Sequence, residues 1–223
     1  MRFSMIVPGL VITAAAIACE ANASIVGGAV TGGSAHSAGG TFKLLTVPLA
    51  NPFGPANSVG QNNFQSVDLY GFDEKQSVVL PVDQVVDVGA SPIPGGTVVA
   101  SHYVFFDPAG SNRLIGSVTF GTKILGILTS RSNLDATDGL VNPGVNYLDP
   151  NARGLESNDS VTILDDFTIA WDTTAASPGD YVRVFTVAPV SAVPEPASIV
   201  SAIFGATALA TVMRSRITRR RGA

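Results

Sequence analysis

The sequence predicts an all-β protein, a single antiparallel β-sandwich or jelly roll, and three observations lead to this fold class. Glycine and proline, at 23 and 14 of 223 residues, break the chain too often for a bundle of long helices. Short runs of β-branched and aromatic residues alternate with turn-forming residues through the middle of the chain. No internal repeat is visible, which argues against a solenoid or a propeller, and an irregular β-barrel is the alternative fold.

The expected strands are separated by turn signals such as residues 107–112 and 177–180. They span residues 41–47, 66–72, 78–82, 97–106, 113–120, 123–129, 160–164, 167–171 and 181–187. The run 97–106 is apolar on both of its faces, which predicts an interior strand. Residues 24–40 and 51–63 are rich in glycine or proline and are expected to be irregular, apart from a short edge strand at the start of the first segment.

The N-terminus has the character of a secretory signal peptide. Arg2 precedes a mostly apolar stretch, and Ala21 and Ala23 supply the small-x-small pattern that signal peptidase recognises. We therefore expect residues 1–23 to be removed by cleavage after Ala23, which leaves a mature chain without cysteine. A buried N-terminal helix and a lipoprotein site at Cys19 are weaker alternatives.

The C-terminus predicts a membrane-spanning helix. Residues 197–213 carry no charge, and their length is near the lower limit for crossing a hydrocarbon core of about 30 Å. A cluster of arginines follows this segment and would stop its transfer through the membrane. By the positive-inside rule, this cluster places the preceding body outside the cytoplasm. Its arginines are Arg214, Arg216, Arg219, Arg220 and Arg221.

The residues before this apolar segment complete a three-part tail at 192–223. They are Val193, Pro194, Glu195, Pro196, Ala197 and Ser198. The motif, the apolar span and the arginine cluster together resemble the PEP-CTERM sorting tail of exosortase substrates. The resemblance implies that a membrane-embedded exosortase recognises the motif and removes the tail, in bacteria that produce an exopolysaccharide matrix. The body at 24–191 resembles, in segments such as 101–108 and 178–184, a domain common among PEP-CTERM proteins that carries no settled activity.

The body is acidic, because the last ten residues hold five of the 13 basic residues of a chain whose net charge is already −4. This balance argues against a nucleic-acid partner. Acidic and amide side chains crowd into residues 135–159, where oxygen ligands suit calcium. A solvated loop with Asx turns is the alternative. The candidate calcium ligands are Asp135, Asp138, Asp149, Glu156 and Asp159.

No catalytic constellation is evident in the sequence. His36 and His102 lack a second His or Cys at metal-ligand spacing, and no Gly-x-Ser-x-Gly elbow or phosphate-binding glycine loop occurs. We therefore expect a non-catalytic, structural or adhesive protein of the cell surface or extracellular matrix, with no cofactor other than calcium. The expected partners are signal peptidase, exosortase, exopolysaccharide and, before processing, the membrane that holds the C-terminal helix.

Two other functions stay open at this stage. One is a secreted carbohydrate-binding module, assisted by calcium, in which exposed aromatic rings stack on sugars. The candidates for this stacking are Tyr70, Tyr103, Tyr147 and Trp171. The other is a secreted hydrolase that uses paired carboxylates, or His102 with Asp107 and a serine.

Overall fold

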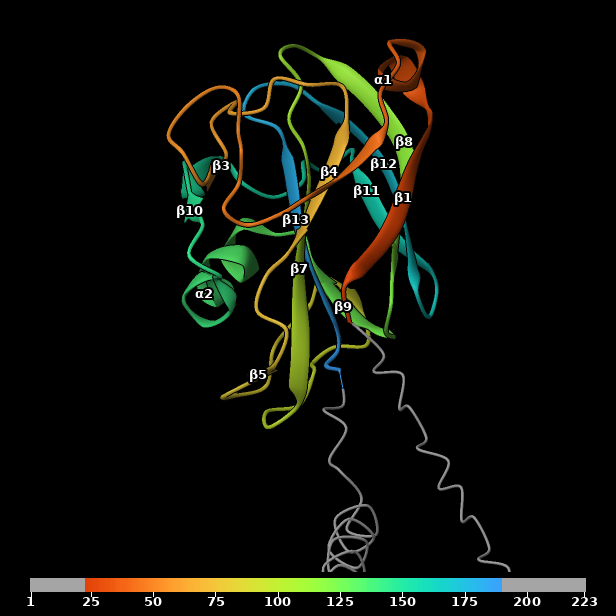
Figure 1. The fold of residues 1–223 in the computed structure, drawn as a ribbon. Helices are drawn as coiled ribbons and strands as arrows, with labels where there is room; N and C mark the ends of the chain where they lie inside the picture. The colour runs from red at the N-terminus through yellow and green to blue at the C-terminus, as the bar shows by residue number, and fades with distance from the viewer. Residues whose placement is uncertain (1–22, 190–223) are drawn as a thin grey trace, which may run out of the picture. The chain divides into compact units, whose positions relative to one another are not determined.

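The computed structural model describes residues 23–189, which fold into two main β-sheets packed face to face (Figure 1). The expected signal peptide up to residue 22, with Ala21, and the expected sorting tail at 192–223 lie outside the described residues. Within the described part, none of the helices has the length and apolar character needed to cross a bilayer.

The elements follow one another as short strands with few helices. They are β1 (Ile25–Gly32), α1 (Gly33–Ser37), β2 (Phe42–Leu45), β3 (Ser58–Val59), β4 (Leu69–Asp73), β5 (Val78–Val79), β6 (Val88–Gly89), β7 (Val98–Phe106), β8 (Asn112–Phe120), β9 (Ile124–Leu128), α2 (Arg131–Val141), β10 (Asn146–Tyr147), the 3-10 helix η1 (Pro150–Ala152), β11 (Ser160–Asp165), β12 (Thr168–Ala175) and β13 (Asp180–Val187).

The strand order confirms an all-β sandwich. The small sheet has the order β1-β8-β12-β11, and every neighbouring pair in it is antiparallel. The large sheet has the order β2-β4-β7-β13-β9-β6, and β5 pairs with the first two residues of β7. Two pairs depart from the expected antiparallel pattern, because β2 runs parallel to β4 and β3 runs parallel to β10.

A hydrophobic core fills the space between the two sheets. Trp171 and Val118 of the small sheet and Val104 and Val184 of the large sheet belong to this cluster, and all are fully buried. Each large side chain buried here contributes roughly 1.5–3 kcal/mol to folding. This core holds the sheets together.

The large sheet is also covered on its other face, where a second core lies against α2 and the loops. Phe105 of β7 stacks on Tyr181 of β13, with ring centroids 6.0 Å apart, and Leu134 of α2 packs into the same cluster. Strands β7 and β13 are therefore buried on both faces, which confirms the prediction of an interior strand at residues 97–106.

The structure corrects two expectations for irregular segments. Helix α2 occupies the first part of the acidic stretch expected to be a loop, and buries Leu134, Thr137 and Val141 along one side. The glycine-rich segment after Ser24 forms a full strand, β1, at the edge of the small sheet. Gly28 allows this close packing, since a Cβ there would lie 2.6 Å from the Phe42 ring.

Replacing Gly116 with alanine tests the close approach of β1 to β8. A Cβ at Gly116 would overlap the carbonyl oxygen of Ala29, so we expect Gly116→Ala to lower stability by about 1–3 kcal/mol in chemical denaturation. The matched control is Gly27→Ala, where a Cβ meets no atom within 4 Å and the expected change is within about 0.5 kcal/mol. Equal losses in the two variants would contradict this packing.

Candidate cation site

The five acidic residues expected to bind calcium do not meet at one place. Asp135 and Asp138 lie on α2, where the Arg153 guanidinium bridges them, with Arg153 Nη2 at 2.6 Å from Asp138 Oδ2. Arg183 Nη2 lies 3.0 Å from the other oxygen of Asp138. Asp149 precedes η1 in a left-handed conformation, with φ of 45°. Asp135 and Asp138 are therefore occupied by cationic side chains of the protein.

Glu156 and Asp159 lie together, and the structure adds Asp180 to them. Single carboxylate oxygens of the three residues all lie within 4.8 Å of one another, and we call these residues the carboxylate cluster. Asp180 begins β13 immediately after Gly179, which turns the chain with φ of 96°. The loop that holds Glu156 reaches this point because Tyr181 N contacts the carbonyl oxygen of Gly154 at 3.5 Å.

Asp159 is fixed in place by the backbone around it. Its Oδ1 accepts the Thr174 N–H of β12 at 2.7 Å, and its own N–H donates to the Glu156 carbonyl oxygen at 3.1 Å. The cluster therefore joins the end of β12, the start of β13 and the loop before β11.

Asp180 is the most unusual member of the cluster. The residue is 0% exposed, and neither of its carboxylate oxygens has a hydrogen-bond partner. Burial raises the pKa of Asp180 to about 8, and the negative charges of Asp159 and Glu156 and the close approach of the Glu156 side chain act in the same direction, while the Thr173 hydroxyl acts against them. A positively charged group bound at this point would favour the ionised form of Asp180.

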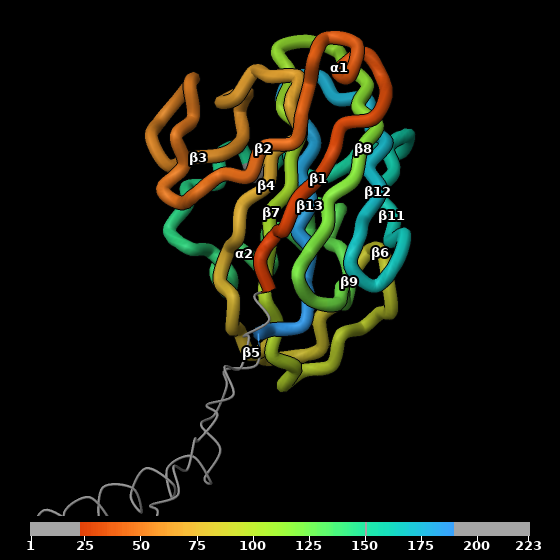
Figure 2. Tube along the Cα trace, turned by 45° about the vertical axis from the view of Figure 1, so that its right-hand side comes forward, coloured from red at the N-terminus to blue at the C-terminus, as the bar shows by residue number. Residues whose placement is uncertain are grey.

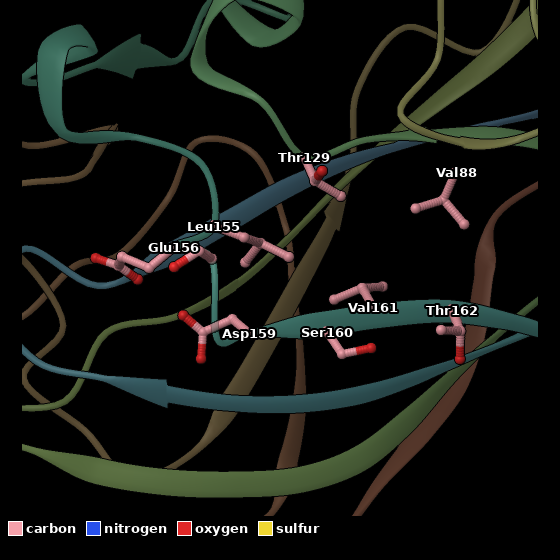
Figure 3. A pocket seen from close by; sticks show the side chains of 9 residues that line it. Val88, Thr129, Leu155, Glu156, Asp159, Ser160, Val161 and Thr162 are labelled. Carbon is pink, nitrogen blue, oxygen red and sulfur yellow. The ribbon is translucent and has the colours of Figure 1, made fainter.

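The cluster borders a shallow surface hollow of about 400 Å³ (Figure 3). Glu156 and Asp159 lie at one end of the hollow, and Val88 and Thr162 lie at the other. Glu156 is exposed and Asp159 is half-buried, so the two carboxylates are accessible from solvent while Asp180 is buried beside them.

Asp180 was not among the ligands expected from the sequence. In the sequence it stands in a turn-forming stretch, Ser177-Pro178-Gly179-Asp180, just before an apolar strand. An acidic residue at the first position of a strand buried on both faces is the signal that could have found it.

The buried polar residues at the centre of the large sheet form a second cluster that is internally satisfied. Arg183 makes two hydrogen bonds to the Glu74 carboxylate, at 2.7 and 2.8 Å, and both side chains are fully buried. Ser101 and Tyr147 also donate to Glu74. The remaining Arg183 donors bind Leu134 O, Thr137 Oγ1 and Asp138 Oδ1, so the Glu74–Arg183 pair is held inside the protein on every side.

His102 also lies in the interior, away from Asp107. Its Nδ1 contacts Asp73 Oδ1 at 2.7 Å and its Nε2 contacts Thr186 Oγ1 at 3.0 Å. The order of groups resembles a nucleophile–base–acid relay, but His102 and Thr186 are 0% exposed. A substrate has no access to this relay in the folded body.

The aromatic residues considered for sugar stacking are not free for that role. Trp171 and Tyr103 are 0% exposed and Tyr70 is 7% exposed. Tyr147 is half-buried and donates to Glu74. A carbohydrate surface on this body would need different aromatic residues.

Comparison of the chain with protein-family models, with curated proteins and with solved structures finds no match.

Removing one partner of the buried Glu74–Arg183 ion pair is expected to lower the free energy of unfolding far more than removing one partner of an exposed ion pair. Arg183→Met leaves Glu74 buried without its guanidinium and should lower stability by about 3–5 kcal/mol. The control is Arg113→Met, whose pair with Asp172 is about half exposed on both sides and should cost at most about 1 kcal/mol. Urea denaturation measures both, and similar losses would argue against a structural role for the Glu74–Arg183 pair.

Asp107 predicts a specific pH dependence of stability. It is 0% exposed, only its Oδ2 accepts a hydrogen bond, from Phe64 N–H, and burial raises its pKa to about 6. Because the unfolded value is about 4, the folded state binds this proton more tightly, and the resulting stability is lost as the pH rises through about 6.

We therefore expect Asp107→Asn to gain in Tm relative to the native protein as the pH rises from 4 to 7.5 in EDTA. Thermal melts measure the difference, with Asp165→Asn, an exposed carboxylate on β11, as the control. A difference that stays constant across this range, or that shrinks, would show that Asp107 is not protonated in the folded state.

Proposed function

We propose that this chain is an exported bacterial surface or matrix protein, sorted by exosortase through its C-terminal tail and non-catalytic. The support for sorting is in the sequence, where Pro194-Glu195-Pro196, an uncharged span and an arginine cluster follow one another. In this proposal, residues 1–23 direct export, and residues 197–213 form a helix that holds the precursor in the membrane until exosortase acts.

The arrangement of the two ends of the body supports a tethered module. Gly121 N donates to the Ser24 carbonyl oxygen at 2.9 Å, and Val187 N donates to the Lys123 carbonyl oxygen at 2.8 Å. The first residues of β1 and the last residues of β13 therefore lie beside one turn, as Figures 1 and 2 also show. We call this the chain-end pole.

A body attached at this pole would present its opposite end to the surroundings. Asp180 and Val187 are the first and last of the eight residues of β13. At about 3.3 Å per residue, the strand separates the carboxylate cluster from the chain-end pole by about 23 Å. The candidate site thus lies at the opposite end of β13 from the chain-end pole.

The buried position of the polar groups supports a structural or adhesive role. His102 and Glu74 are both buried and held by other side chains in the interior. The exposed Glu156 and the half-buried Asp159 lie beside Asp180, in an arrangement that suits cation binding.

Mass spectrometry of protein recovered from a host with an active exosortase tests the sorting proposal. We expect the surface form to lack residues 214–223, because the tail is removed at or near the motif. In an exosortase-deficient strain, and for the Glu195→Ala variant, we expect the arginine cluster to stay attached. Recovery of intact residues 219–221 from the surface of the competent host would contradict the proposal.

A further inference from the structure

We propose that the carboxylate cluster of Glu156, Asp159 and Asp180 is a calcium site. Three carboxylates from two separate segments place oxygen atoms within 4.8 Å of one another. Glu156 and Asp159 belong to the loop before β11, and Asp180 belongs to β13. This inference concerns the folded body alone, and it stands or fails independently of how the tail is sorted.

Asp180 distinguishes this cluster from an ordinary solvated acidic loop. Its side chain is shielded from water, and neither of its oxygens has a partner in good hydrogen-bonding geometry, although the Thr173 hydroxyl and the Glu156 side chain lie close to it. A buried carboxylate without donors is unfavourable, and a metal ion supplies both the missing contacts and the opposite charge. Glu156 is exposed and Asp159 is half-buried beside the surface hollow, so an ion can reach this position from solvent.

The positive side chains of the described residues do not balance the charge of the cluster. Each Arg in residues 23–189, and each Lys except Lys75, forms an ion pair with a carboxylate outside the cluster, and Lys75 donates to the Leu140 carbonyl oxygen. Those pairs are Lys43–Asp68, Arg113–Asp172, Lys123–Asp166, Arg131–Asp135, Arg153–Asp135, Arg153–Asp138, Arg183–Glu74 and Arg183–Asp138. The remaining sources of positive charge are in solution, as a metal ion or as a proton on Asp180.

The ligand chemistry favours calcium over other biological cations. All three side chains offer oxygen only, whereas zinc sites in proteins usually include histidine or cysteine. Calcium accepts about six to eight oxygens in irregular arrangements, with carboxylates bound through one or both atoms. Magnesium requires a near-ideal octahedron and usually keeps several waters, with one or two carboxylates. Three carboxylates at the edge of an open hollow fit calcium with water as the remaining ligands.

A bound calcium ion would link the loop before β11 to the start of β13. Asp159 is held by the end of β12 through Thr174, and Asp180 is the first residue of β13. When all three carboxylates are ionised they repel one another at this junction, and a bound calcium ion would offset that repulsion and link them. We therefore expect calcium to stabilise the fold as well as to bind.

Calcium titration of the full chain, purified in detergent and stripped with EDTA, tests the site. Isothermal titration should show one calcium ion per chain, and Tm should rise by about 5–10 °C at roughly 100 times Kd. Magnesium at the same concentration should give a clearly smaller rise. Asp180→Asn, which keeps the shape and removes the charge, should weaken calcium binding at least tenfold without lowering Tm in EDTA.

Two further variants distinguish calcium binding at this cluster from weak binding of calcium to the acidic surface of the body. Glu156→Gln changes an exposed side chain, so it should fold normally and still bind calcium at least tenfold more weakly. Asp165→Asn, also exposed and on β11, should keep the full calcium response. The proposal is overturned by an absence of binding at millimolar calcium, by unchanged affinity in Asp180→Asn and Glu156→Gln, or by an equal response to magnesium.

Discussion

The burial of β7 and β13 on both faces is the constraint on which the rest of this structure depends. The small sheet covers one face of the pair, and α2 with its neighbouring loops covers the other. Polar side chains on these strands must therefore find partners inside the protein. Arg183 binds Glu74, and His102 lies between Asp73 and Thr186. The packing thus explains why Arg183 and His102 contact other side chains inside the protein.

Asp180 is the exception among the charged side chains of this strand pair. It starts β13 with no hydrogen-bond partner, at the point where Glu156 and Asp159 approach from the loop. The opposite end of β13 lies at the chain-end pole, beside Ser24. One strand therefore connects the place where a tethered body would be attached to the place where we propose that calcium binds.

The sequence predicts the parts of this molecule that depend on local pattern. Strand β7 can be predicted from the sequence because its residues are apolar on both faces. The all-β class follows from the spacing of such runs along the chain. Helix α2 could not be predicted from the sequence, because its buried residues Leu134, Thr137 and Val141 lie among polar residues in a stretch that resembles a loop. The cation site needs tertiary information, since Asp180 lies far along the chain from Glu156 and is buried only when the sheets stack.

Diffraction from crystals grown in calcium, with the anomalous signal recorded, tests the central claim most directly. The account predicts an anomalous peak at about 2.3–2.6 Å from a carboxylate oxygen of Asp180, with Glu156 and Asp159 as further ligands. Crystals at millimolar calcium that show no peak there, and in which Asp180 is bound by water or by Thr173 instead, would contradict it.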